Sequence, residues 1–297
     1  MQLTEMTKWQ HIFLSPHLDD VVLSCGGTLA YLAEIGARRQ IITLFAGTPA
    51  PNTPFSVFAA YQHDMWRTPQ QAYHTRRDED AAALSCLGIE ATWLDFYDCI
   101  YRGKPSEGCW YYNSDDDIFG SIHPADMDTV WPIAEAVKAA FVSNHPSNSN
   151  QRPAELTIYA PLTAGNHVDH QLTFLVALQF LADGYEVQFY EEYPYADRDP
   201  ANIDQALYET TPVLINRMPG VAQLVKNISP TQLWRSRIQP FSQDALDLKI
   251  KAIAAYQTQL EVLFGGLEAM TQRVRAYANQ VGQSKPAERF WLLNQSH

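Results

Sequence analysis

The segment SPHLDD holds the first side chains of the sequence that could do chemistry together. Its His17, Asp19 and Asp20 come directly after HIFLS, an apolar run with the length of a buried strand. Imidazole and carboxylate groups are ligands of catalytic zinc, and they are also side chains that transfer protons. A structural role explains the segment equally well on its own, because an aspartate at the start of a helix caps free N–H groups.

A second segment, GNHVDH, favours a functional interpretation. It follows another apolar run, LTIYA, and its His167 and His170 are three residues apart, so both rings lie on similar faces of a first helical turn. Parallel strands end at one edge of a sheet, where open α/β folds bind their ligands. Hydrolysis at a catalytic zinc needs three protein ligands, a base for the water proton and a group that meets charge on the carbonyl oxygen. The two segments together supply side chains for all of these tasks.

The elements that position these segments alternate between strands and helices. Apolar runs of strand length lie at residues 11–15, 41–45, 91–96, 156–160 and 186–190, and helical patterns lie at residues 19–36, 75–87, 125–143 and 171–182. This alternation predicts a three-layer α/β/α, Rossmann-like fold around a mostly parallel sheet. Residues 246–264 have helical periodicity without an accompanying strand. We therefore expect one domain over residues 1–297, with an α/β core at 1–200 and a helical and loop C-terminal region at 201–297 packed on it.

Two connections, residues 47–73 and 101–123, are longer than a compact α/β unit needs. Connections of this length without structure of their own are often lids or binding loops. We expect them to border the site, although the sequence assigns neither of them a role.

The residues around the two segments resemble a known family, the LmbE-like or PIG-L-type zinc N-deacetylases, which remove acetyl groups from N-acetylglucosaminyl compounds. SPHLDDVVLSCGG and GNHVDH are similar to the paired motifs of that family, and RRDED at 76–80 is similar to its R-x-x-E helix. The segment DFYD at 95–98 and the late Lys251, Tyr256 and Gln259 also fit the family pattern. The similarity extends over most of the chain, and the two His/Asp motifs are its most specific part.

The resemblance implies a role for the residues of both motifs. His17, Asp20 and His170 would bind zinc, and Asp19 would act as the general base. His167 would be the protonated partner that stabilises the oxyanion or assists departure of the amine.

Three further residues receive roles from the same comparison. The resemblance implies that Arg76 and Asp98 hold sugar hydroxyls of the substrate. Asp169 is better placed beyond the ligands, where it orients a histidine or caps the helix.

The sequence departs from the family pattern in both motifs. The common form of the first motif is A-H-P-D-D-E, and here Leu18 replaces the proline and Val21 the final acid, so no implied ligand is lost. The tyrosine that some relatives place shortly before the second motif is absent, because residues 164–166 are AGN. A phenol contribution to the oxyanion therefore has no source at that position.

Composition and charge narrow the function classes. Hydrophobic residues make up 46% and charged residues 18% of the 297 residues, an ordinary globular composition. The formal net charge of −12 opposes binding that neutralises phosphates, so we expect neither nucleic acid nor a membrane surface as a partner. Without a signal-like N-terminus or a long apolar window, we expect a cytoplasmic protein whose cysteines are reduced and mostly buried. The sequence leaves the oligomeric state open, including a homo-oligomer.

These observations together predict a zinc-dependent hydrolase. We expect it to remove the acetyl group of a small-molecule substrate, an N-acetylated amino sugar of the GlcNAc type or its conjugate, with metal-activated water. Fe²⁺ or Co²⁺ can take the same nitrogen and oxygen ligands as Zn²⁺. Two alternatives stay open at this point: a metal-dependent amidohydrolase for a non-sugar N-acyl metabolite, and a catalytically silent carbohydrate-binding protein of the same fold.

Overall fold

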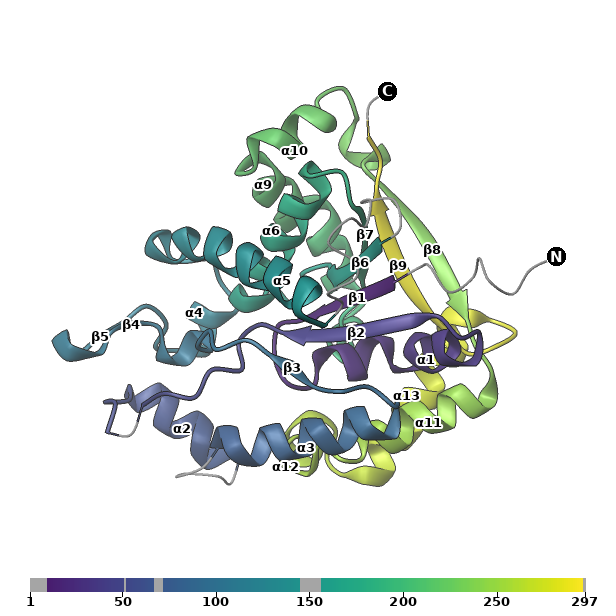
Figure 1. Ribbon diagram of the computed structural model, residues 1–297, viewed down its shortest axis with the longest axis horizontal. Coiled ribbons are helices and arrows are strands. Elements are labelled where there is room, and N and C mark those ends of the chain that lie inside the picture. Colours follow the sequence, from purple (N-terminus) through teal and green to yellow (C-terminus); the bar gives the residue numbers. More distant parts are fainter. Residues whose placement is uncertain (1–9, 51, 67–71, 145–155, 296–297) are drawn as a thin grey trace.

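Figure 1 shows a computed structural model of the protein, which describes residues 10–50, 52–66, 72–144 and 156–295. Its central element is a seven-stranded sheet in the order β3-β2-β1-β6-β7-β9-β8. The strands are β1 (Gln10–Ser15), β2 (Arg38–Thr43), β3 (Thr92–Trp93), β6 (Leu156–Pro161), β7 (Glu186–Tyr190), β8 (Trp234–Pro240) and β9 (Ala287–Leu293). Strands β1, β2, β3, β6 and β7 are parallel to one another. The predicted mostly parallel α/β fold is thus confirmed.

Helices cover both faces of the sheet, and each face has its own apolar core. One face carries α5 (Val130–Asn144), α6 (Val168–Ala182), α9 (Thr211–Asn216) and α10 (Pro219–Leu224), as Figure 1 shows. The opposite face carries α1 (Asp20–Glu34), α3 (Ala72–Cys86), α11 (Gln243–Ile253), α12 (Gln257–Phe264) and α13 (Leu267–Gly282). Strands buried between two helical layers are almost continuously apolar, which is why β1, β6 and β7 are evident in the sequence.

Two glycines let α1 pack closely against the C-terminal helices and loops. A Cβ atom on Gly27 would lie 2.3 Å from the Phe241 ring, and one on Gly26 would lie 2.8 Å from Cγ of Lys249. Both distances are too short for a Cβ atom, so only glycine fits at these two positions of α1. This packing fixes α1, and with it the preceding loop that contains His17.

The C-terminal region differs from the predicted set of helices and loops, because it contributes two strands to the sheet. β9 pairs antiparallel with β7, and β8 pairs antiparallel with β9 at the sheet edge. β8 reads WRSRIQP and exposes most of its side chains, so it has no apolar run to reveal it. Its partner β9 is separated from it along the chain by three helices, a pairing that local patterns do not show.

Smaller differences concern the ends of elements. The helix expected over 125–143 begins as a 3₁₀-helix, Pro124–Thr129, before α5. The strand expected over 91–96 is only the two-residue β3. α6 begins at Val168 rather than at residue 171, and it therefore includes His170.

The two long connections contain short elements of their own. The first contains α2 (Val57–Met65), and its residues 51 and 67–71 lie outside the described part. The second region contains the 3₁₀-helix Cys99–Tyr101, the strand pair β4 (Gly103–Lys104) and β5 (Cys109–Trp110), and α4 (Asp115–Ile118). Among the described residues, no helix has the length and apolar character needed to span a bilayer.

Candidate metal and catalytic site

The two His/Asp segments meet at the carboxyl ends of neighbouring strands. β1 and β6 are hydrogen-bonded partners, and the chain continues from β1 toward β2 on one side and reaches β6 on the other. This reversal of strand order opens a crevice in α/β sheets. The ring centre of His17 lies 4.9 Å from that of His167 and 5.5 Å from that of His170. The sequence prediction that both segments share one site is therefore consistent with the fold.

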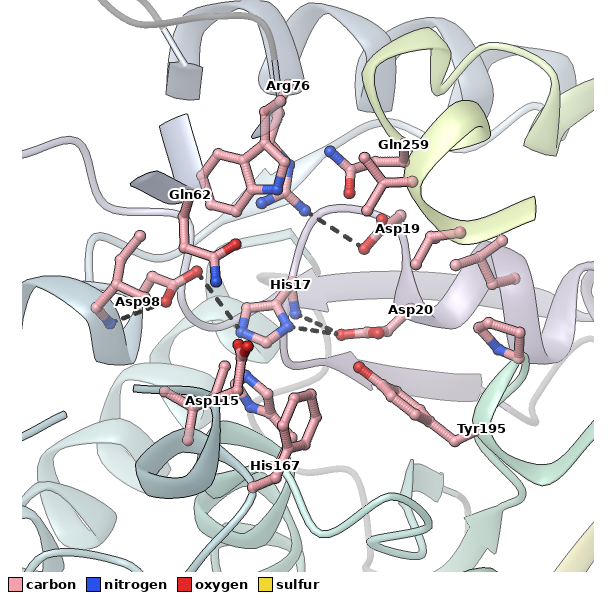
Figure 2. A pocket seen from close by; sticks show the side chains of 18 of the residues that line it. His17, Asp19, Asp20, Gln62, Arg76, Asp98, Asp115, His167, Tyr195 and Gln259 are labelled. Atoms are coloured by element: carbon pink, nitrogen blue, oxygen red, sulfur yellow. Dashed lines mark hydrogen bonds and ion pairs between the residues drawn. The ribbon is translucent and has the colours of Figure 1, made fainter. Parts of the chain in front are cut away.

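Three side chains of this cluster converge on one point. Oδ2 of Asp20 lies 3.2 Å from Nδ1 of His17 and 3.3 Å from Nε2 of His170 (Figure 2 shows the first contact). His17, His167 and His170 also offer ring nitrogens that lie within 4.8 Å of one another. Imidazole and carboxylate groups are ligands of Zn²⁺ in proteins, so the residues present fit a divalent metal.

Each of these two histidines is held from behind by a second carboxylate. Nε2 of His17 lies 2.9 Å from Oδ2 of Asp169, and Nδ1 of His170 lies 3.2 Å from Oε1 of Glu192. A carboxylate on the far ring nitrogen fixes which nitrogen carries the proton and turns the other lone pair toward the metal. Asp169 therefore has the orienting position that the sequence suggested, and its contact is with His17.

Backbone geometry explains how Glu192 reaches this position. Its carboxylate accepts hydrogen bonds from the backbone N–H groups of Leu162, Thr163 and Ala164, at 2.7–3.2 Å. Thr163 has a φ angle of 80° and Gly165 one of 83°, which curl the loop after β6 around the carboxylate. Strand β7, which pairs with β9, ends at Tyr190, two residues before Glu192. The signal that could have found this residue is thus the same one that found His17, a polar side chain at the carboxyl end of a strand.

Asp19 is free for chemistry because it does not cap α1. It occupies the N-cap position of that helix, but its side chain makes no capping hydrogen bond. Burial raises the pKa of its carboxyl group, although the Arg76 guanidinium 3.6 Å away opposes that shift. A buried carboxylate with a raised pKa is a stronger base than a solvated one. The helix-capping interpretation of this residue is therefore not supported.

His167 has a defined tautomer in the structure. Its Nδ1 accepts the backbone N–H of Asp169 at 3.2 Å, as the N-cap of α6. Burial, together with the neighbouring His17, lowers the pKa of His167 well below its usual value. A neutral ring whose Nδ1 is an acceptor carries its proton on Nε2. Nε2 is then the ring nitrogen that can donate, and the protonated role that the family resemblance implies stays a prediction.

His17, Asp19, Asp20 and His167 line a cavity of about 230 Å³ (Figure 2). Arg76 and Asp98 both line it, as the family resemblance suggests. The Arg76 guanidinium stacks on the Trp66 ring, 4.7 Å from its centre. Asp98 also has a structural role, because its Oδ1 accepts the backbone N–H of Ile100 at the start of a 3₁₀-helix.

Tyr195 is a wall residue that the sequence analysis did not single out for chemistry. It begins α7 (Tyr195–Arg198), and its phenol points toward the side of the cavity where Asp20 lies (Figure 2). A Cβ atom on Gly165 would lie 2.6 Å from the Tyr195 ring. Gly165 therefore leaves room for the ring of a tyrosine from another element. No local pattern in the sequence shows this relation.

The cysteines are less buried than expected. Cys25 and Cys99 are buried, Cys86 is half-buried and Cys109 is exposed, and all four are free thiols. Sγ of Cys99 lies 3.9 Å from Nε2 of His167, so this thiol packs against the site. Cys99 belongs to neither of the two His/Asp motifs.

Similarity to known proteins agrees with this site. A 2'-N-acetylparomamine deacetylase from Niallia circulans is 29% identical over 292 residues, which cover 95% of this chain and 90% of that protein. A protein of the same name from Streptomyces fradiae is 27% identical over 209 residues, covering 67% of this chain and 62% of that protein. The crystal structure of a zinc-inhibited teicoplanin deacetylase shares the fold, with a TM-score of 0.73, 24% identity, and 97% and 98% of the two chains covered.

One family accounts for the motifs and for the strands that carry them. The PIG-L family, described as GlcNAc-PI de-N-acetylase, matches residues 12–181. This segment begins within β1 and ends within α6, so it contains both His/Asp motifs. It covers more than half of the chain, and the protein therefore belongs to the PIG-L family and is a metal-dependent deacetylase.

Proposed function

We propose that this deacetylase hydrolyses the acetamide of an N-acetylated amino sugar or of a conjugate that carries one. The observation that carries the proposal is the approach of His17 and His170 to one carboxylate oxygen of Asp20, beside Asp19, whose carboxylate makes no helix-capping hydrogen bond. Relatives named for the deacetylation of an amino-sugar compound support the substrate class.

We assign the metal to His17, Asp20 and His170. These residues would hold a divalent cation, which would supply Lewis-acid polarisation of the acetyl carbonyl and a water of lowered pKa. Asp169 and Glu192 keep the two rings oriented from behind, through the hydrogen bonds described above. Zn²⁺ is the metal we expect, and Fe²⁺ or Co²⁺ suit the same donors.

Proton transfer falls to Asp19. Its carboxylate takes a proton from the attacking water, and the same proton then passes to the nitrogen that leaves as an amine. The C–N bond breaks as the new C–O bond remains, so the products are acetate and a free amino group. Arg76, 3.6 Å from the Asp19 carboxylate, holds that side chain toward the cavity.

The developing oxyanion needs hydrogen-bond donors, and His167 offers one. Its Nε2–H is the donor that remains because Nδ1 already accepts the N–H of Asp169. The phenol of Tyr195 is a second donor in the wall of the same cavity, and burial raises its pKa, so it keeps its proton. Donors fixed before the reaction stabilise the transition state without reorganisation.

The cavity also indicates how a conjugate is accommodated. At about 230 Å³ it has room for little more than the reacting part of the substrate. Asp115, Phe119 and Arg198 line it and are exposed, so the cavity opens to solvent on their side. We expect the acetamide and its sugar ring to lie inside, held by Arg76 and Asp98, and the rest of a conjugate to extend outward.

Acetate release tests the proposal directly. The metal-loaded protein should release acetate from N-acetylglucosaminyl compounds and little from N-acetyl amino acids. Asp19→Asn should lower kcat by at least about a hundredfold, the usual scale for loss of a general base, while bound metal stays unchanged. Asp244→Asn, an exposed position in the first turn of α11, is the matched control. Preference for the amino acids would favour the non-sugar amidohydrolase, and near-native turnover of Asp19→Asn would remove that residue as the base.

A further inference from the structure

The carboxylate behind His17 has its two oxygens committed to different partners. Oδ2 of Asp169 accepts from Nε2 of His17 at 2.9 Å and from the backbone N–H of Cys99 at 3.0 Å. Oδ1 lies 2.6 Å from a terminal nitrogen of Arg102. The side chain of Asp169 is completely buried, so water does not compete for these contacts. The direction of the carboxylate, and hence of the His17 ring, is decided by Cys99 and Arg102.

Arg102 is itself held on every side. Its Nε donates to Oδ2 of Asp126 at 2.9 Å, and one terminal nitrogen donates to the carbonyl oxygen of Tyr97 at 2.9 Å. The guanidinium also lies over the rings of Phe45 and Tyr112, at 5.0 and 5.6 Å from their centres. The guanidinium therefore bridges two buried aspartates with its planar face packed.

Tyr112 extends this arrangement by one more residue. Its hydroxyl donates to the same oxygen of Asp126 at 2.7 Å and accepts the backbone N–H of His123 at 2.9 Å. We call Arg102, Tyr112 and Asp126 the Arg102 network. No member of it lines the catalytic cavity as the described residues define it.

We propose that Arg102 is a positioning residue for the metal site, acting through Asp169 to aim Nδ1 of His17 at the metal. The inference rests on the proposed function, because it takes His17 as a ligand. It also gives the part of the long connection around Arg102 a role, because this part anchors a proposed ligand from behind.

The type of residue at position 102 matters for this role. A guanidinium presents donors in a rigid plane and can contact Asp169 and Asp126 at once, while it stacks on aromatic rings. A lysine would keep the positive charge, but its ammonium has no planar array of donors and cannot stack on the aromatic rings in the same way. Asp169 would then be held less rigidly, and the His17 ring with it.

Metal affinity of the full-length protein tests the inference. Arg102→Lys should raise the Kd for Zn²⁺, measured by competition with a chromophoric chelator, by about tenfold, the lower end of the range for residues that contact a metal ligand directly, because Arg102 acts through Asp169. With Co²⁺ as the probe, its visible absorption spectrum should shift, because the orientation of one imidazole changes. The control is Arg237→Lys in β8, where the arginine bonds Gln188 and Gln239 away from the site. It should leave both readouts unchanged.

The outcomes separate positioning from general packing. A purely structural role would lower the melting temperature of the metal-free protein and leave Zn²⁺ affinity as in wild type, and that result would overturn the inference. If Arg102→Lys does not fold, Tyr112→Phe decides, because it removes one hydroxyl and keeps the ring: weaker Zn²⁺ binding supports the inference and unchanged binding contradicts it. If the wild-type protein binds Zn²⁺ and releases no acetate, the proposed function is wrong but the inference about Arg102 still stands. The Zn²⁺ affinities are measured without any enzymatic turnover.

Discussion

The two histidine ligands are oriented by carboxylates that are held in different ways. Glu192, behind His170, is fixed by three backbone N–H groups of the loop that follows β6. Asp169, behind His17, is fixed by one backbone N–H and by the side chain of Arg102. One support is therefore made from the main chain next to the sheet, and the other from a side chain of a long connection.

This difference separates what the fold supplies from what a substitution can tune. Backbone N–H groups are present whatever the side chains are, so the support of Glu192 is as permanent as the loop conformation. The support of Asp169 depends on the identity of residue 102. We expect changes on the Glu192 side to affect the stability of the loop together with metal binding, and changes on the Arg102 side to affect mainly metal binding.

Removal of a ligand should have the largest effect. His170→Ala takes away a metal-binding nitrogen, so the Kd for Zn²⁺ should rise by more than about 100-fold, beyond the range for an outer partner. Protein purified without added zinc should then contain far less than one metal per chain by elemental analysis. His74→Ala, exposed on α3, is the matched control and should keep full metal content. Full occupancy in His170→Ala would exclude that residue from the ligand set.

Substitution of Glu192 should lower the stability of the protein more than substitution of Arg102. Glu192→Gln turns an amide NH₂ toward backbone N–H groups that now donate to a carboxylate, which leaves buried donors without acceptors. The metal-free protein should lose about 1–3 kcal/mol in its free energy of unfolding, measured by urea denaturation. Its Kd for Zn²⁺ should rise by about 10–100-fold.

Two comparisons decide that prediction. Glu90→Gln, at an exposed position, should leave both stability and affinity unchanged. Arg102→Lys should lose less unfolding free energy than Glu192→Gln for a similar change in metal affinity. Equal losses of stability in the two variants would mean that main-chain and side-chain supports do not differ as proposed.

The same distinction explains how far the sequence alone could lead. The proximity of His17, Asp20 and His170 was predictable because each stands directly after or within an element with a strong local pattern, and the parallel arrangement brings such positions together. Their role as metal ligands stays a prediction. Arg102 and Tyr112 lie in a connection with no periodicity, and their partners are set only by tertiary packing.

Two other features depended on distant parts of the chain. β8 has a polar pattern because it lies at the sheet edge, and its pairing with β9 becomes visible only in three dimensions. Tyr195 reaches the cavity because Gly165, thirty residues earlier, leaves space for its ring. Neither relation has a local signature, so periodicity and motif spacing could not reveal them.

A further expected effect is a pH dependence of metal binding that reports on the contact between His170 and Glu192. Burial alone would lower the pKa of His170, but the carboxylate of Asp20 and the contact with Glu192 overcome it and raise that pKa to about 9. The metal-free ring then holds a proton that the unfolded chain would release near pH 6.5. Its contribution to the stability of the metal-free protein is full below pH 6.5 and is lost as pH rises through 9.

Zn²⁺ must displace that proton, so the apparent affinity should increase over the same window, by at most about tenfold per pH unit for one proton. Chelator competition between pH 6.5 and pH 10 measures the profile. In Glu192→Gln the component that ends near pH 9 should move to lower pH, because a neutral amide no longer favours the charged ring. Arg102→Lys should leave that component in place, since Arg102 has no contact with His170 or Glu192 among the contacts described. A shift of the same size in both variants would show that the two supports act on a single coupled unit, and the comparison between them would fail.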